Sequence, residues 1–286
     1  MNNSFFPALV LVISSIFWGL SWLPLKFLNQ HGFEGIPLLL ISQGLLALLF
    51  TPLGLKGARQ ANKSLSLLGI AGAGGAAILC FTYALMYGDV IRVMVLFYLL
   101  PVWGVLGGKL FLHEQPDAQR WIGVALALGG AFLILGGFKI FDAPPSWIDL
   151  LALASGLFFA ANNMLYRAEQ ALPLSTKLMA MFWGCAVLAL LLIVAGVQSL
   201  PSVNTGMSWL WLLLYTFTWL LFSNFASQWA VTRMEAGRSS IILIVELVAA
   251  VISALLIANE RLNGIEWLGC AMVVTAAILE AGRKES

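Results

Sequence analysis

Long runs without a charged residue dominate the hydrophobic pattern of this chain. Residues 1–25, 35–55 and 64–88 contain no Asp, Glu, Lys or Arg, and residues 178–232 form another charge-free run. A helix needs about 20 predominantly apolar residues to cross the hydrocarbon core of a bilayer. The longest run is interrupted by a polar stretch at residues 198–202, so it predicts two crossings. The pattern therefore indicates an all-α integral membrane protein.

Over the whole chain, the apolar runs predict ten transmembrane helices. Ten helices of about 20 residues leave only short connections among the 286 residues and no room for a soluble domain. The predicted crossings are residues 5–27, 36–54, 64–87, 91–112, 119–138, 147–168, 174–197, 208–232, 237–258 and 263–282.

Composition narrows the classes of protein further. Charged residues make up 10% of the chain, against about 25% in soluble domains, and the net charge is +2. This balance argues against a basic nucleic-acid-binding surface. The three cysteines, Cys80, Cys185 and Cys270, form no C-x-x-C pair and predict neither a disulfide framework nor a metal site. We expect no metal, no cofactor and no nucleic-acid partner.

The basic residues are distributed unevenly over the predicted loops. Loops on one side hold 11 of the 15 Lys and Arg residues, and loops on the other side hold four. Because basic residues are enriched in cytoplasmic loops, both chain ends are predicted to be cytoplasmic. The first apolar run lacks the basic start of a cleaved signal peptide, so we expect a retained helix.

The two halves of the chain repeat one another. Near the end of each half the spacing is 146, and Glu114, Trp121 and Gly123 recur as Glu260, Trp267 and Gly269. Near the start of each half it is 141, and Ser14, Trp18 and Lys26 recur as Ser155, Phe159 and Arg167. The repeats predict two five-helix units, residues 1–140 and 141–286. Because five is odd, the units would cross the bilayer in opposite senses.

Inverted repeats are typical of secondary transporters. In those proteins the substrate site lies near the membrane midplane between the halves, and rocking of one half against the other gives alternating access. The step from this architecture to a function is an analogy between folds.

At these residues the chain resembles the EamA family of the drug/metabolite transporter superfamily. The shared features are the two five-helix units, the Glu at the end of each fourth helix and the Trp-x-Gly helix after it. The resemblance implies a multi-pass carrier of the bacterial inner membrane, usually an exporter of amino acids or other small metabolites. It also implies that helices 1–4 and 6–9 of the ten surround a central cavity. The chain departs from the family in one respect, since Leu100-Pro101 and Glu246-Leu247 stand where a Glu-Pro pair is often found.

Glu246 is the strongest candidate for a functional side chain. It is the one acidic residue of 13 that falls in the middle of a predicted crossing. An ionisable group there costs about 2.5–3.5 kcal/mol on insertion scales and normally faces a cavity or a partner. We interpret Glu246 as a counter-ion for a substrate amine or a protonation site. The alternative is a protonated Glu that only bonds a neighbouring helix.

Further polar and aromatic residues lie on helical faces that could line the predicted cavity. They could bind substrate, or they could serve interhelical packing, where hydrogen bonds contribute about 0.6 kcal/mol each on average. The candidates are Asn162, Asn163, Trp18, Phe159, Tyr166, Trp103, Tyr83, Asn224 and Gln228.

Five residues are candidates for gating or structural roles. Pro101 removes a backbone hydrogen bond inside the fourth crossing and predicts a hinge. Lys26 and Arg167 end the first and sixth crossings on opposite sides, where cations complement helix C-termini. For Glu114 and Glu260 we expect structural bonds to loop amides or to the start of the next helix.

The sequence thus favours a transporter of small metabolites, such as amino acids, over an enzyme. No catalytic residues are predicted, since the two histidines fall on opposite sides and no catalytic motif is present. A multidrug or nucleoside carrier of the same fold is the alternative, and an intramembrane enzyme is the rival from another class. The expected partners are a small-molecule substrate and the lipid bilayer, with coupling to protons or facilitated diffusion as alternatives. The chain is compatible with a monomer or a weak homodimer.

Overall fold

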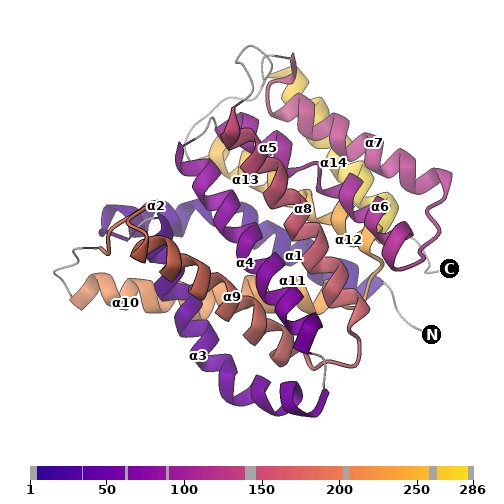
Figure 1. Cartoon of the computed structure of the whole chain (residues 1–286). Coiled ribbons are helices and arrows are strands. Elements are labelled where there is room, and N and C mark those ends of the chain that lie inside the picture. The colour runs from indigo at the N-terminus through magenta and orange to yellow at the C-terminus, as the bar shows by residue number, and fades with distance from the viewer. Residues whose placement is uncertain are drawn as a thin grey trace.

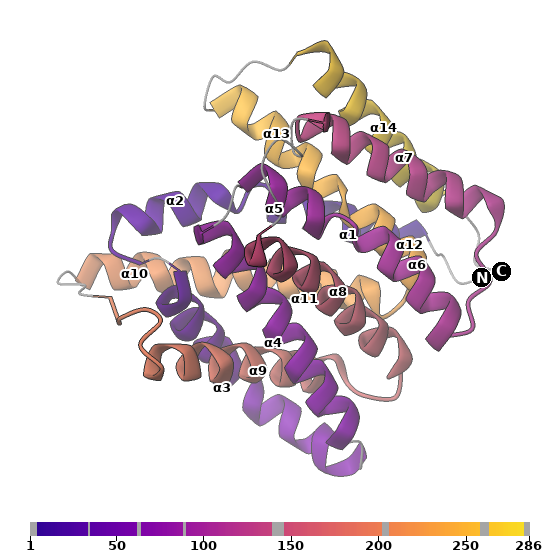
Figure 2. The ribbon, with the colours of Figure 1, turned by 45° about the horizontal axis from the view of Figure 1, so that its top comes forward.

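The computed structural model describes residues 5–33, 35–61, 64–87, 90–138, 146–201, 206–257 and 263–282. Over these residues the chain is helical, with no strand, and the helices form one bundle (Figure 1). The first described helix begins, and the last one ends, at the same end of that bundle (Figure 2). Glu260 and the other residues outside these ranges are not described.

The helices of the first half are α1 (Phe5–Gly19), α2 (Trp22–Gln30), α3 (Gly35–Ala61), α4 (Ser64–Tyr87), α5 (Val90–Phe97), α6 (Leu100–Phe111) and α7 (Ala118–Ile134). Those of the second half are α8 (Trp147–Ala168), α9 (Leu174–Val194), α10 (Gly206–Leu214), the π-helical segment η2 (Tyr215–Leu220), α11 (Leu221–Val231), α12 (Ala236–Leu243), α13 (Val245–Ile257) and α14 (Gly264–Ala281).

Seven stretches of the described chain are long and apolar enough to span a membrane. The interrupted fourth and ninth predicted crossings and the 17-residue α7 fall outside that group. The seven stretches are Phe5–Gln30, Gly35–Arg59, Leu65–Leu85, Trp147–Ala168, Leu174–Val194, Gly206–Val231 and Gly264–Ala281.

Helix boundaries in the two halves follow the repeat seen in the sequence. The short helices α5 and α12 begin at Val90 and Ala236, 146 positions apart, and each is eight residues long. Helices α7 and α14 begin at Ala118 and Gly264, again 146 positions apart. The interruption after α5 therefore has a counterpart after α12, although only the first is followed by a proline.

The halves interlock through equivalent helices. Helix α3 packs on α9, α7 on α14, and α6 on α12, as both views show for the first two pairs (Figures 1 and 2). The first helix of each half also packs on the interrupted helix of the other half, since α1 contacts α12 and α13 while α8 contacts α5 and α6. The two interruptions are thus held between the halves.

The surface of the bundle is suited to lipid. Large apolar side chains point outward along the helices, among them Leu65 at 82% and Val194 at 77% exposure. Polar side chains such as Gln43, Asn163 and Gln228 are buried instead. A large exposed apolar surface marks an interaction site in a soluble protein, and around a whole helical bundle it matches a bilayer.

Candidate functional site

The two helix interruptions meet at a hydrogen bond between a phenol and a carboxylate. Tyr98, in the turn between α5 and α6, donates from its hydroxyl to Glu246 Oε1 at 2.8 Å. Glu246 is the second residue of α13, directly after the interruption at Ile244. The Tyr98 side chain is buried and that of Glu246 is half-buried. The candidate residue Glu246 therefore has a partner from the other half of the chain.

Helix α1 approaches this pair because Gly19 has no side chain. A Cβ atom at Gly19 would lie 2.2 Å from the backbone oxygen of Glu246 and 2.7 Å from Cβ of Ala249. Real Cβ atoms essentially never come that close, so only glycine allows α1 to lie against α13 here.

A second glycine makes the corresponding contact in the other half. A Cβ atom at Gly156 of α8 would lie 2.7 Å from the backbone oxygen of Phe97, the last residue of α5. Pro101, in the first turn of α6, has no N–H to donate to that oxygen. Pro101 therefore lies at the start of a new helical segment, just after the interruption, and the freed carbonyl faces α8.

Three aromatic candidates lie in the apolar core between the halves. Phe159 lies with its ring 5.9 Å from that of Phe97. The Trp18 indole donates to Ser227 Oγ at 3.2 Å, which joins α1 to α11. The buried Nε1 atom of Trp103 has no hydrogen-bond partner within the described residues. Trp18, Trp103 and Phe159 pack against the same apolar core between the halves.

Two buried amides lie at the same depth on α8 and α11. The ends of these helices meet where Arg167 Nη1 donates to the backbone oxygen of Thr232 at 3.5 Å. Asn163 lies one turn before Arg167, and Gln228 lies one turn before Thr232. Their side chains are 3% and 2% exposed, and each has a polar atom without a partner in the described chain. An unpartnered buried polar group is costly, so these amides are suited to hydrogen-bond a substrate.

Four other candidates have local or peripheral partners. Asn224 Nδ2 donates to the backbone oxygen of Leu220 in its own helix at 2.9 Å. Asn162 Nδ2 and the Tyr166 hydroxyl both point at Met181 Sδ, each at 3.9 Å, between α8 and α9. Tyr83 stacks on Tyr87 and Trp147, with ring centroids 4.5 and 5.7 Å away. These contacts favour packing roles for Tyr166 and Tyr83, whereas the buried Oδ1 atom of Asn162 has no partner within the described residues.

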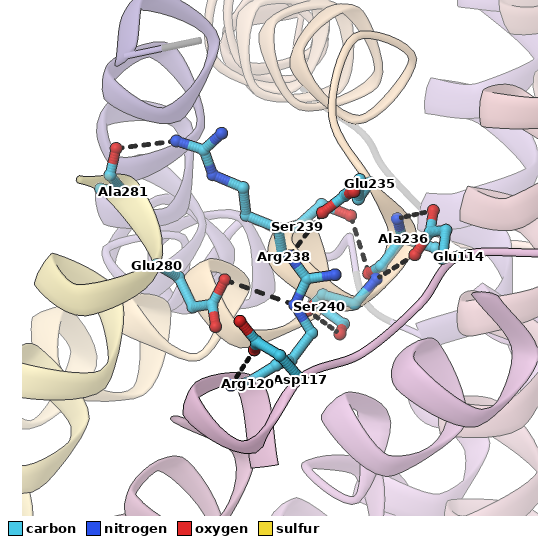
Figure 3. Close-up of polar contacts among 11 residues, drawn as sticks. Glu114, Asp117, Arg120, Glu235, Ala236, Arg238, Ser239, Ser240, Glu280 and Ala281 are labelled. Carbon is cyan, nitrogen blue, oxygen red and sulfur yellow. Dashed lines mark hydrogen bonds and ion pairs between the residues drawn. The ribbon is translucent and has the colours of Figure 1, made fainter. Parts of the chain in front are cut away.

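A cluster of charged residues joins the halves at the end of the bundle where α1 begins and α14 ends (Figures 2 and 3). In this Arg120 cluster, Arg120 of α7 forms ion pairs with Glu235 and, at 3.6 Å, with Glu280 of α14. Arg120 and Glu280 are 2% and 0% exposed. Arg238 donates to the backbone oxygen of Ala281 at 2.7 Å. The cluster thus ties α7 to α12 and α14.

Glu114 caps the start of α12 in the same region. Its carboxylate accepts from the backbone N–H of Ala236 at 2.8 Å and of Gly237 at 3.4 Å. Burial raises the pKa of Glu114 above its usual range, and the two amide hydrogen bonds lower it in part. Glu114 therefore bonds helix-start amides, but those of the other half instead of the next helix.

A cavity of about 390 Å³ opens beside Glu114 and is lined by Leu112, Glu114, Arg167 and Gln170. Lys26 is exposed and lies in the middle of α2, which continues to Gln30, so it does not end its helix as the sequence predicted. Glu260, the repeat counterpart of Glu114, lies outside the described residues. Over the part of the chain that the structure describes, no three His, Cys, Asp or Glu side chains come together to hold a metal ion.

Sequence patterns indicate no partner for three residues that the structure makes prominent. Tyr98 sits in a continuous apolar run, and only the nearby Pro101 hinted at an interruption there. Arg120 falls at the start of the predicted crossing 119–138 with no signal of a partner, but it is buried in ion pairs. Lys177 is fully buried at the start of α9, where its Nζ donates to the backbone oxygen of Tyr166 at 2.8 Å. No spacing rule connects partners so far apart in the sequence.

Comparisons with known proteins agree with this architecture. The sequence model of the EamA-like transporter family matches the chain twice, over residues 5–136 and 146–280. A solved structure described only as "Crystal structure of protein" superposes with a TM-score of 0.76 at 17% identity and covers 95% of each chain. That likeness concerns the fold alone. No curated protein matches the chain.

Proposed function

The chain belongs to the EamA-like transporter family, and we propose that it is a secondary transporter that exports small metabolites such as amino acids. The transporter class follows from that membership and from the apolar helical bundle. The direction and the substrate class are our inference, drawn from the half-buried acid and the neighbouring amides and aromatics. The proposed location is the bacterial inner membrane, with both chain ends in the cytoplasm.

The proposed topology has ten crossings in two inverted five-helix halves, residues 1–140 and 141–286. The matched helix boundaries, 146 positions apart, support this arrangement. So does the pairing of α3 with α9 and α7 with α14. The interrupted pairs α5–α6 and α12–α13 would each make one crossing, with the interruption near the middle.

The observation that carries the proposal is the hydrogen bond between Tyr98 and Glu246. It joins the two halves at the points where both helices are interrupted. Alternating access requires a contact between halves that can be remade around a central site. A carboxylate at this point can bind a substrate ammonium group, or a proton in its place, and Tyr98 would hold it when neither is bound.

Counterflow in proteoliposomes tests the proposal. The purified protein is reconstituted into vesicles that are loaded with an unlabelled amino acid, amine or nucleoside. Accumulation of the same solute, labelled and added outside, identifies the solutes that are carried. Glu246→Gln is expected to abolish or uncouple the flux while the protein remains folded. Glu266→Gln is the matched control, because Glu266 completes the capping box at the start of α14 and Gln serves in that role as well.

Two results would count against the proposal. Normal flux with unchanged pH dependence in Glu246→Gln would remove Glu246 from the site. Counterflow of nucleosides or drugs, but of no amino acid, would replace the substrate class and leave the transporter assignment intact.

A further inference from the structure

The cavity beside Glu114 is distinct from the site around Glu246. It lies at the end of α6 and the end of α8, so its walls come from both halves of the chain. It is an open hollow with a volume of about 390 Å³. At this end of the bundle the Arg120 cluster holds α7, α12 and α14 together.

Its lining carries one acid and one base. Within the described residues, the one hydrogen bond of the Arg167 guanidinium is the 3.5 Å contact with the backbone oxygen of Thr232, so most of its donors are open to a ligand. A guanidinium binds a carboxylate through two parallel N–H···O bonds. Arg167 is therefore suited to bind a carboxylate group of a ligand in this cavity.

Glu114 supplies the opposite charge. Its two oxygens accept from Ala236 and Gly237, and a carboxylate has about four acceptor positions. It can therefore accept from an ammonium group without releasing α12. The positive end of the α12 dipole also stabilises its ionised form.

Gln170 completes the polar wall. Its Nε2 atom donates to the backbone oxygens of Thr232 at 2.7 Å and Arg167 at 3.2 Å, which fixes the amide across the ends of α8 and α11. This arrangement holds the backbone around Arg167 in place at the rim of the cavity. The remaining lining residue, Leu112, is apolar.

We propose that this cavity is a loading site for a zwitterionic small molecule of the amino-acid class, with Arg167 binding its carboxylate and Glu114 its ammonium group. A simple amine or a simple acid would satisfy only one of the two charges and leave the other uncompensated. The inference rests on the proposed transport function, because it describes where the substrate binds before it reaches Glu246.

Equilibrium binding in a Glu246→Gln background separates the cavity from the central site. The probe is labelled phenylalanine, with phenylalaninamide and N-acetylphenylalanine as competitors that lack one charge each. The full-length protein is used in nanodiscs. We expect saturable binding of phenylalanine, with competition by either analogue at least about tenfold weaker, as expected for the loss of one hydrogen-bonded charge.

Substitutions of the lining residues then show which charged group of the ligand each residue binds. Arg167→Gln is expected to weaken phenylalanine binding at least about tenfold and to remove the discrimination against phenylalaninamide. Glu114→Gln is expected to remove the discrimination against N-acetylphenylalanine. Lys26→Gln, which neutralises a base at the other end of the bundle, is the control and should bind as its parent does. Arg167→Lys should bind more tightly than Arg167→Gln.

The outcomes distinguish failure of the loading site from failure of the proposed transport function. Absence of saturable binding in the Glu246→Gln background overturns the loading site, even if counterflow shows that the wild type is a carrier. Equal effects of Arg167→Gln on phenylalanine and phenylalaninamide overturn the assignment of Arg167 to the carboxylate. If binding persists but no solute shows counterflow, the cavity stands and the proposed transport function fails.

Discussion

Tyr98 and Glu246 each lie at the interruption of a helix, in opposite halves of the chain, and are joined by a 2.8 Å hydrogen bond. The interruptions occupy equivalent places in the repeat. Pro101 leaves the Phe97 carbonyl without an N–H donor from its own helix, and α8 lies against that carbonyl at Gly156, while α1 lies against the first turn of α13 at Gly19. The helix ends, the acid and the two close glycine contacts therefore form one structural unit.

Removal of the Tyr98 hydroxyl tests whether this contact supports transport. In Tyr98→Phe the ring is retained and Glu246 loses its donor, so we expect a fall in the counterflow rate of about tenfold, since hydrogen bonds to charged groups contribute about 1.5–3 kcal/mol. Tyr83→Phe removes a hydroxyl from the stack with Tyr87 and Trp147 and is the control. A rate in Tyr98→Phe equal to that of the control would show that the contact is only structural.

The close approach of α1 to α13 predicts a specific intolerance at Gly19. In Gly19→Ala the new methyl group would meet the backbone at Glu246, which cannot move as a side chain does. We expect destabilisation by about 1–3 kcal/mol, the usual effect of overpacking, measured as a lower unfolding midpoint in detergent. Gly44→Ala is the matched control, because a Cβ atom at Gly44 of α3 meets nothing within 4 Å. That change should be neutral or stabilising, since alanine favours a helix. Equal midpoints for the two variants would contradict this packing.

Much of the helical layout was predictable from the sequence. The predicted range 64–87 matches α4, and 147–168 matches α8. Apolar length and the position of charges decide where a helix lies in a membrane, and both are local properties. The interruptions were harder. Pro101 marks one of them, but the one at Ile244 falls in a run of Ile, Leu and Val that gives no local signal and depends on packing between the halves.

The candidate site was predictable only in part. Glu246 stood out because a lone acid in an apolar helix is unusual. Its partner Tyr98 did not, because a tyrosine in such a helix has many uses. Asn162 and Asn163 share one sequence signal, yet Asn162 points at Met181 while Asn163 lies one turn before Arg167. Neighbouring positions on a helix face different elements, so only the tertiary arrangement distinguishes them.

The ion pairs of Arg120 predict a strong effect on stability. Arg120→Met leaves the buried Glu280 without one of its charged partners, and breaking a buried pair typically costs about 3–5 kcal/mol. We expect a markedly lower unfolding midpoint in detergent. Lys109→Met, an exposed base in the last turn of α6, should have little effect.

A paired substitution separates charge from shape at Arg120. When Glu280→Met is added to Arg120→Met, the uncompensated acid is removed, and apolar replacements of buried ion pairs are often neutral. The double variant should therefore recover part of the lost stability. A double variant no more stable than Arg120→Met would show that the polar contacts of Glu280 with other residues dominate.

The raised pKa of Glu114 gives a pH dependence with a definite sign. Burial raises its pKa in the folded state, so the folded protein binds a proton that the unfolded chain has already released. As the pH rises from about 4, the usual carboxyl value, through the raised pKa, the wild type loses stability relative to Glu114→Gln. We expect the difference in the free energy of unfolding, wild type minus variant, to fall over this range. Gln115→Ala changes an exposed residue without a titratable group and should show no such trend. A difference that grows with pH would contradict the prediction, because it would mean that folding lowers the pKa of Glu114.

The inverted arrangement of the halves predicts that equivalent residues face opposite compartments. Lys26 in α2 and Arg167 in the last turn of α8 are 141 positions apart in the repeat. Lys26 and Gln170, three residues after Arg167, are both exposed, so cysteines at these two positions report their sides of the membrane.

A labelling experiment reads out the two sides. In a background without Cys80, Cys185 and Cys270, a membrane-impermeant maleimide added to intact cells should label Lys26→Cys and spare Gln170→Cys. After permeabilisation both should react. Because basic residues are enriched on the cytoplasmic side, the exposed Lys109→Cys should behave like Gln170→Cys and serves as the control. If Lys26→Cys and Gln170→Cys react from the same side, the two halves cross the bilayer in the same sense, and a site between inverted repeats is excluded.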